Sequence, residues 1–257
     1  MPTTADLTAD NPRGAHARRT TAWIAGGLAA AAGLTGGLLA PADAVQGQAQ
    51  RLMYLHVPAA WVAYLAFAAV LAASVAHLIG GDLRWDRIAR ASAEIGVALT
   101  TAAIGTGSLW GHLVWGTWWA WDPRLVSTAL LLLAYIGYLA LRRALAERVG
   151  GTDGGDRRTA RVAALAGIAG FLLVPVVHFS VLWWRSLHQQ ATVLAPGQPP
   201  IDPRMALALL LAVAAASTGA LLALAHRTLR LERRLAVAAE TSTTGAGTTR
   251  RGLARVR

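Results

Sequence analysis

Tryptophan is concentrated in two short segments of this sequence. Seven of the ten tryptophans are Trp110, Trp115, Trp118, Trp119, Trp121, Trp183 and Trp184, and residues 115–122 read W-G-T-W-W-A-W-D. Indole rings are broad and flat, and they stack on extended planar ligands. A belt of tryptophans at the lipid headgroups is the alternative, but a belt accounts for one or two indoles per helix end. Five indoles within residues 110–121 therefore predict a surface for a flat, apolar molecule.

Two histidines lie next to these segments. His56 stands in the run Y-L-H-V-P, and His188 shortly follows the second tryptophan segment. Neutral imidazole is a common axial ligand of haem iron, so two histidines from different segments could bind one iron from opposite faces. A lone histidine in a loop is more often a solvated surface residue, but a pair flanking a tryptophan surface favours ligation. His112 and His178 are alternative or supporting ligands.

Two arginines and three further residues complete the candidate site. Arg51 precedes His56 by five residues and Arg124 ends the first tryptophan segment. Arginine pairs with carboxylates through two parallel hydrogen bonds, so both arginines are candidates for the haem propionates. The alternative is that they anchor helix ends at lipid headgroups. The remaining candidates are Gly116, for close backbone approach, Asp122, as the N-cap of a helix that begins at Pro123, and Trp184, for ligand contact.

Composition indicates that a membrane holds these residues in place. Of the 257 residues, 55% are apolar and only 14% are charged, and the mean hydropathy is +0.44; a soluble domain carries roughly a quarter charged residues. The chain has no cysteine, which excludes disulfides, thiolate metal sites and the C-x-x-C-H motif of a c-type cytochrome. All 24 basic residues are arginines. They cluster beside apolar runs, which indicates membrane topology and lipid contact rather than nucleic-acid binding.

Six apolar segments are long enough to cross a bilayer as helices. Their cores are 22–40, 58–79, 89–109, 125–141, 160–182 and 205–226. We therefore expect an all-α membrane protein with six transmembrane helices in residues 22–226. A cytoplasmic tail of residues 1–21 precedes them, and a basic cytoplasmic tail of residues 227–257 follows. An alternative for the first segment is a cleaved signal peptide, which would leave five spans.

The arginines also predict which way the helices run. With both termini in the cytoplasm, twenty arginines face inward, and the outer segments hold only Arg51, Arg124, Arg185 and Arg204. Positive residues accumulate on the cytoplasmic side of membrane proteins. The tryptophan-rich loop and both candidate histidine ligands then face the outside of the membrane, which is the periplasm in a bacterium.

These motifs together resemble a known family. The W-G-T-W-W-A-W-D run, residues 54–60 upstream and residues 183–189 downstream are similar to the CcmC haem exporter family of cytochrome c maturation system I. The resemblance covers about residues 45–226. CcmF and CcsA proteins share the tryptophan motif but have more spans or extra domains. By position, His56 and His188 match the family's ligand histidines, and Trp115, Trp118, Trp119, Trp121 and Asp122 match its signature.

The resemblance implies a function and a set of partners. Such proteins hold haem b at the periplasmic face of the bacterial inner membrane and deliver it to the haem chaperone CcmE. They work with the ABC transporter subunits CcmA and CcmB and the small membrane protein CcmD. They are not enzymes, since presenting haem changes no bond. Two alternatives remain, a haem–apocytochrome c ligase component and a transporter that moves haem across the bilayer.

Overall fold

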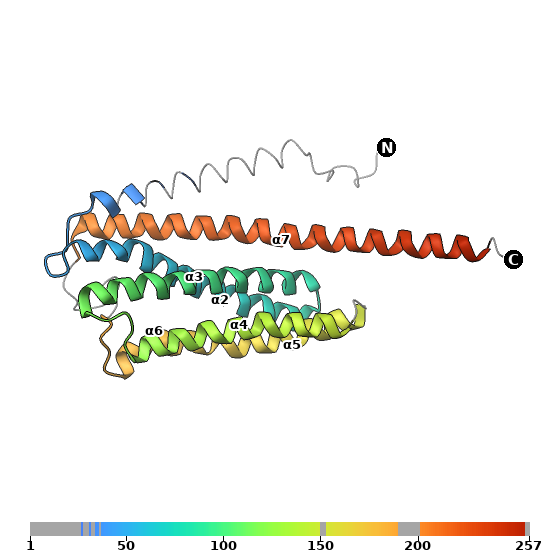
Figure 1. Cartoon of the computed structure of the whole chain (residues 1–257), viewed down its shortest axis with the longest axis horizontal. Helices are drawn as coiled ribbons and strands as arrows, with labels where there is room; N and C mark the ends of the chain where they lie inside the picture. Colours follow the sequence, from blue (N-terminus) through green and yellow to red (C-terminus); the bar gives the residue numbers. More distant parts are fainter. Residues whose placement is uncertain are drawn as a thin grey trace.

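The computed structural model describes residues 27, 31, 34, 35, 37–149, 153–189 and 201–254. Its elements are a short 3-10 helix η2 (Gln48–Leu52) and six α-helices: α2 (Met53–Gly80), α3 (Leu83–Trp115), α4 (Pro123–Val149), α5 (Asp153–Phe171), α6 (Leu173–Trp183) and α7 (Pro203–Ala254). The helices run side by side along one long axis, and α7 extends beyond the others (Figure 1). The described ranges contain no β-sheet, only the single bridge between Asp43 and Gly47. The prediction of an all-helical chain is therefore confirmed.

Within the described ranges, four stretches are long and apolar enough to cross a membrane: Gln48–Gly80, Pro123–Arg148, Arg157–Trp183 and Pro203–Glu232. They match four of the six predicted segments. The predicted third segment, 89–109, lies in the 33-residue helix α3, which is long enough to span but is not among the four. The predicted first segment, 22–40, lies mostly outside the described residues. The count of six spans therefore stays a prediction.

The predicted fifth span, 160–182, is interrupted at Leu172, where α5 ends and α6 begins. Pro175 follows three residues later. Proline has no N–H to donate to the preceding turn, and its ring clashes with the carbonyl of residue i−4, which here is Phe171. The chain adjusts with a tighter turn, in which the N–H of Leu172 donates to the carbonyl of Ala169 at 3.2 Å.

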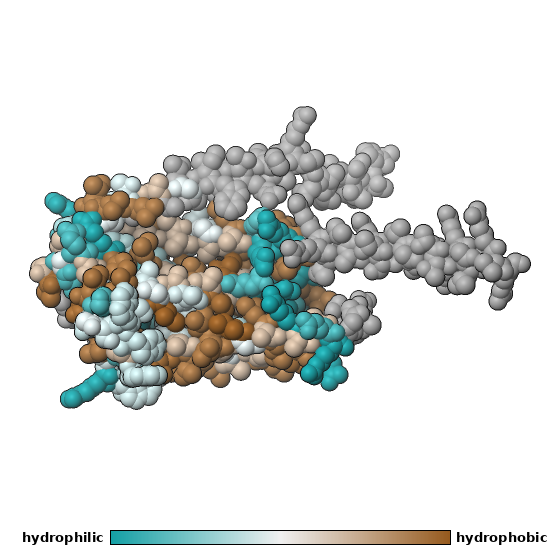
Figure 2. Space-filling view, viewed as in Figure 1, coloured by the Kyte–Doolittle hydropathy of each residue, from teal (hydrophilic) through white to brown (hydrophobic). Residues whose placement is uncertain are grey.

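The surface has the polarity expected for a lipid environment. Large leucines on the outside of the bundle are well exposed, including Leu133 (61%), Leu165 (60%) and Leu221 (67%). On the face shown in Figure 2, apolar surface covers the middle of the bundle and hydrophilic residues gather towards its ends. Lipid rather than water suits such a middle zone, because water strongly disfavours a large contiguous apolar surface.

Small residues let the helices pack closely, as is usual between membrane helices. Helix α2 packs most extensively against α3 and also contacts α5 and α7. At Gly96 of α3, a Cβ atom would lie 2.4 Å from the ring of Phe67, so only glycine fits there. Phe67 in turn stacks on Tyr135 of α4, with ring centroids 3.9 Å apart, and both side chains are fully buried.

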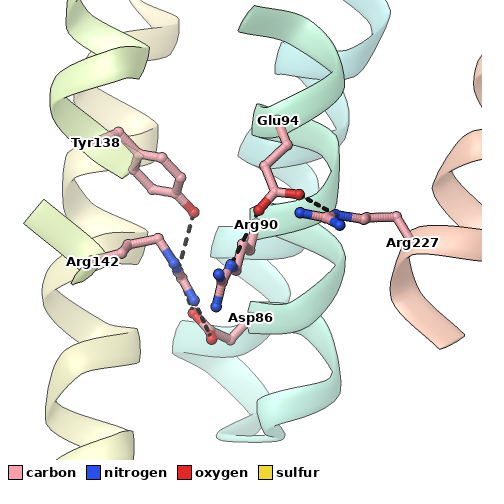
Figure 3. Close-up of polar contacts among 6 residues, drawn as sticks. All are labelled: Asp86, Arg90, Glu94, Tyr138, Arg142 and Arg227. Carbon is pink, nitrogen blue, oxygen red and sulfur yellow. Dashed lines mark hydrogen bonds and ion pairs between the residues drawn. The ribbon is translucent and has the colours of Figure 1, made fainter. Parts of the chain in front are cut away.

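Ion pairs join three helices at one end of the bundle (Figure 3). Arg142 of α4 donates to both carboxylate oxygens of Asp86 on α3, at 2.7 and 2.5 Å, and also to the hydroxyl of Tyr138. Glu94 of α3 pairs with Arg90 one turn away and with Arg227 of α7. These contacts fix α4 and α7 to α3. We call this the ion-pair end of the bundle.

The other end is where α2 begins, α3 ends, α4 begins and α6 ends. Residues 116–122 connect α3 to α4 there, and residues 184–189 follow α6. We call this the loop end. Helix α7 also begins there, beside the start of α2 (Figure 1). Because five helix termini meet at the loop end, residues that are far apart in the sequence can converge on one site.

Candidate functional site

His56 and His188 meet at the loop end. His56 lies in the first turn of α2, and His188 lies in the non-helical segment after α6. Their ring centroids are 6.2 Å apart, and the ring planes are inclined by 39°. The structure thus brings together the two histidines that the sequence singled out.

Hydrogen bonds determine which nitrogen of each ring is available to a ligand. Nδ1 of His56 lies 2.9 Å from the carbonyl oxygen of Ala103, and Nδ1 of His188 lies 2.8 Å from that of Gln189. A carbonyl oxygen can only accept, so each Nδ1 carries the proton and donates it. Nε2 of each ring then holds a free lone pair. This is the arrangement that metal-binding histidines use, with the second nitrogen bonded to a carbonyl group.

A pocket opens next to the two imidazoles and encloses about 1020 Å³ of empty space, including its mouth. Side chains of α2, α3 and α4 form most of its wall, and His188 and Gln189 close one side. Of the predicted site residues, five line the pocket: His56, Trp115, Trp119, Arg124 and His188. The wall is mainly apolar and aromatic, as in pockets that take up small organic ligands.

The tryptophans of the loop end divide into two groups. Trp110, Trp115 and Trp119 line the pocket. Trp118, Trp121 and Trp184 do not line it, and their side chains are 57%, 87% and 53% exposed. The ring of His112 stacks on Trp118, with centroids 4.2 Å apart and an interplanar angle of 7°, so His112 belongs to this exposed group. Of the five indoles in residues 110–121, the structure therefore places three at the pocket and leaves two, Trp118 and Trp121, exposed.

Arg51 does not reach the pocket. Its guanidinium donates to the carbonyl oxygens of Gly37, Leu38 and Ala40 and to the side chain of Gln48. Carbonyl groups without helical partners attract a cation at a helix C-terminus. In this structure Arg51 therefore secures the segment before η2, and no contact supports its predicted pairing with a propionate.

Gly116 has a different role from the one expected. Its φ of 74° is in the left-handed region, and its N–H donates to the carbonyl of His112 at 3.2 Å. A left-handed glycine is the usual way to end a helix. A Cβ atom there would meet open space, so close approach to a ligand is not what requires glycine. Gly116 terminates α3 and turns the chain into the loop.

Among the described residues that line the pocket, Arg124 is the only arginine. One of its N–H groups donates to the carbonyl oxygen of His178 at 3.2 Å. Burial lowers the pKa of His188 to about 4, and the positive charge of Arg124 adds to this effect. His188 is thereby kept neutral, which is the form that binds a metal.

Asp122 caps α4 as expected. Its side chain accepts from the N–H of Arg124 at 2.9 Å, and its carbonyl accepts from the N–H of Val126 at 2.9 Å. The residue is only 5% exposed, which is unusual for a cap at a loop.

Several residues that the sequence did not single out also shape the site. Tyr64 lines the pocket two turns after His56 on α2, and its ring meets His178 edge-on at 6.2 Å. Helical spacing from His56 could have identified it. Gln46 accepts from Trp110 and donates to the amide of Gln189, next to His188. No sequence pattern pointed to this amide link between loops.

The donor set suits haem better than a bare metal ion. Among the described residues, no group of three or more His, Cys, Asp or Glu side chains could hold an ion. Haem iron needs at most two protein ligands, because the porphyrin supplies four. Two imidazoles with free Nε2 atoms, an apolar aromatic wall and one guanidinium match the iron, the macrocycle and a carboxylate of such a ligand.

Comparison with known proteins agrees with this reading. The family model described as Heme exporter protein C matches residues 9–241. The Heme exporter protein C of Bradyrhizobium diazoefficiens is 38% identical over 194 residues, covering 75% of this chain and 71% of the relative. That of Escherichia coli K12 is 39% identical over 166 residues, covering 65% of this chain and 63% of the relative. A putative cytochrome c biosynthesis ccmC-like mitochondrial protein of Marchantia polymorpha is 34% identical over 155 residues, covering 60% of this chain. The match spans most of the described helices, and the chain belongs to the heme exporter protein C (CcmC) family.

Proposed function

We propose that this chain is a haem-binding membrane subunit that presents haem to the periplasm and delivers it to the chaperone CcmE for c-type cytochrome assembly. The observation that carries the proposal is the pair of imidazoles at 6.2 Å, each with Nδ1 bonded to a carbonyl and Nε2 free. The names of the relatives, which describe a haem exporter and a role in cytochrome c biosynthesis, support it.

Each residue of the pocket has a definite task in this proposal. His56 and His188 supply the two axial nitrogens. Trp115 and Trp119 pack against the macrocycle, and Arg124 pairs with a propionate. The apolar wall excludes water and thereby favours a porphyrin over a polar ligand. Haem b is the form that the family resemblance implies, and the chain has no cysteine for thioether attachment of haem.

The orientation and partners belong to the same proposal. Arginine placement supports cytoplasmic termini, so the loop end faces the periplasm and the protein lies in the bacterial inner membrane with six spans. CcmA, CcmB and CcmD are the expected membrane partners. Arg51, Gly116, Trp118, Trp121 and Trp184 stay predicted haem contacts without support from the pocket geometry.

An absorption spectrum of the purified, haem-loaded protein tests the ligand assignment. Two imidazoles should give a six-coordinate, low-spin iron. His56→Ala and His188→Ala should each lose that signature, and the double variant should lose most of its haem. His112→Ala should leave the spectrum unchanged, because its ring stacks on Trp118 outside the pocket. Full haem occupancy in the double variant would refute the assignment.

Delivery is tested separately, with haem-loaded protein in vesicles. Adding CcmE should move haem to the chaperone, whereas adding apocytochrome alone should form no thioether bond. Thioether formation would instead support the ligase alternative, and haem uptake into vesicles containing this chain alone would support the transporter alternative.

A further inference from the structure

The tripeptide Asp-Pro-Arg begins two helices in this chain, at residues 122–124 and 202–204. Both copies cap in the same way. The N–H of Arg124 donates to Oδ1 of Asp122 at 2.9 Å, and the N–H of Arg204 donates to Oδ1 of Asp202 at 2.8 Å. Each aspartate carbonyl also accepts from the N–H four residues later, that of Val126 or Ala206, at 2.9 Å. The two contacts of Asp202 are therefore sufficient to cap a helix.

Asp122 makes two further bonds, and Asp202 makes no such bonds to residues within the described ranges. Oδ1 of Asp122 accepts from the hydroxyl of Ser186 at 3.0 Å, and Oδ2 accepts from the N–H of Leu187 at 2.7 Å. The Ser186 hydroxyl oxygen in turn accepts from the N–H of His188 at 3.1 Å. Asp122 is buried where Asp202 is exposed. Oδ2 of Asp122 thus binds the backbone of the segment that carries His188.

In the part of the chain that the structure describes, one other side-chain bond reaches this segment, from the amide of Gln46 to that of Gln189. Residues 184–189 follow the end of α6 and form no helix. Trp184 and Leu187 are 53% and 58% exposed, so burial of neighbouring side chains contributes little to their position. Hydrogen bonds to a carboxylate are stronger than bonds between neutral groups, so the two bonds to Asp122 hold this segment more firmly than the bond between the amides of Gln46 and Gln189.

We infer that Asp122 is a positioning residue for His188, and that its carboxylate, through Ser186 and Leu187, holds this imidazole opposite His56. The inference rests on the proposed function, because it assumes that His188 is an iron ligand. Asp122, the last residue of the W-G-T-W-W-A-W-D run, then has a role apart from contact with the porphyrin. The loop that supplies Trp119 would thus also fix the second axial ligand.

The test compares Asp122→Asn with Asp202→Asn in the full-length, haem-loaded protein. Asparagine keeps one acceptor oxygen for the cap, but its NH₂ group cannot accept from Leu187. In Asp122→Asn we expect loss of the low-spin spectrum, return of that spectrum when imidazole is added, and haem loss to excess apomyoglobin that is about tenfold faster.

Asp202→Asn should behave like the wild type. Ser186→Ala keeps the cap and should show a smaller change in the same direction, so it tests the link even where Asp122→Asn folds poorly.

The outcomes separate this inference from the proposed function. If His188→Ala changes the wild-type spectrum but Asp122→Asn and Ser186→Ala do not, Asp122 only caps a helix and the inference fails. Equal spectral changes in Asp122→Asn and Asp202→Asn would also overturn it, because they would trace the effect to capping. If the wild-type protein has no low-spin spectrum, or His188→Ala leaves it intact, the ligand assignment itself is wrong.

Discussion

Gly107 of α3 faces the imidazole of His56 on α2 so closely that no side chain fits between them. A Cβ atom on Gly107 would lie 2.9 Å from Cε1 and 3.2 Å from Nδ1 of His56. The same ring is held at Nδ1 by the carbonyl of Ala103, one turn earlier on α3. Helix α3 therefore fixes His56 by direct contact, while a loop holds His188.

Gly107→Ala should therefore displace His56 and lower haem occupancy. The added methyl group must push the ring away, since contacts at 2.9 Å are tighter than Cβ atoms tolerate. We expect a several-fold weaker haem affinity and a partly high-spin spectrum. Gly105→Ala on the same helix is the matched control, because a Cβ atom there meets open space. Equal haem affinities in the two variants would show that the contact does not position His56.

The two groups of tryptophans should differ in their effect on haem binding. Trp119→Ala removes an indole from the pocket wall, so haem affinity should fall about tenfold. Trp121→Ala, in the same loop, removes a side chain that is 87% exposed and should change haem affinity little. Haem titration followed by absorbance measures both. A larger loss in Trp121→Ala would mean that the exposed indoles, rather than the pocket, contact the ligand.

Ligation by His188 should persist in acid. The ordinary pKa of histidine is 6.5, and that of His188 is lowered to about 4 by burial and by Arg124, with a smaller opposing effect from its hydrogen bond to the carbonyl of Gln189. Only the neutral ring binds iron, so protonation competes with ligation below the pKa. The low-spin spectrum should stay constant from pH 8 to about pH 5 and decline towards pH 4. Loss beginning near pH 6.5 would show an imidazole of ordinary pKa.

Arg124→Gln should move that decline to higher pH. Removing the positive charge near His188 raises the pKa of the ring, although burial, the larger cause, remains. The measurement is the same pH titration of the low-spin spectrum. A midpoint unchanged from the wild type would show that Arg124 does not act on His188.

At the ion-pair end, Arg142→Ala should destabilise the fold without changing the haem spectrum. It leaves the largely buried carboxylate of Asp86 without its bidentate partner, which should lower the free energy of unfolding by about 3 kcal/mol. The neighbouring Arg143 is exposed, so Arg143→Ala is the control and should change stability little. Thermal unfolding in detergent compares the two. Equal melting temperatures would contradict a structural role for the Asp86 pair.

The helices were predictable because a bilayer demands long apolar runs, and α2, α4, α5 with α6, and α7 all contain predicted cores. The convergence of His56 and His188 was also predictable, since both residues lie at helix ends on the same side of the bundle. Helical spacing carries less information about loops. Trp118 and Trp119 are adjacent in sequence, yet only Trp119 lines the pocket, because the turns after Gly116 decide which way each indole points.

Contacts between distant loops were outside the reach of sequence patterns. Asp122 could be recognised as a cap from Pro123 beside it, but nothing local indicated Ser186 and Leu187 as further partners. The partners of Arg51 could not be predicted for a similar reason. Its partners are backbone carbonyl groups, which every residue possesses and no sequence motif marks.

The stacked pair of Phe67 and Tyr135 restricts how anything leaves the pocket. The two rings lie one helical turn beyond Ala63 and Leu131, which line the pocket, and neither ring is accessible. Passage towards the ion-pair end would require this pair to separate. The stacked pair therefore separates the pocket from the ion-pair end and leaves the loop end as the open side. Under the proposed function, release of haem would be an exchange reaction at the loop end, in which an acceptor protein competes with His56 and His188 for the iron and the acceptor's own affinity sets the direction of transfer.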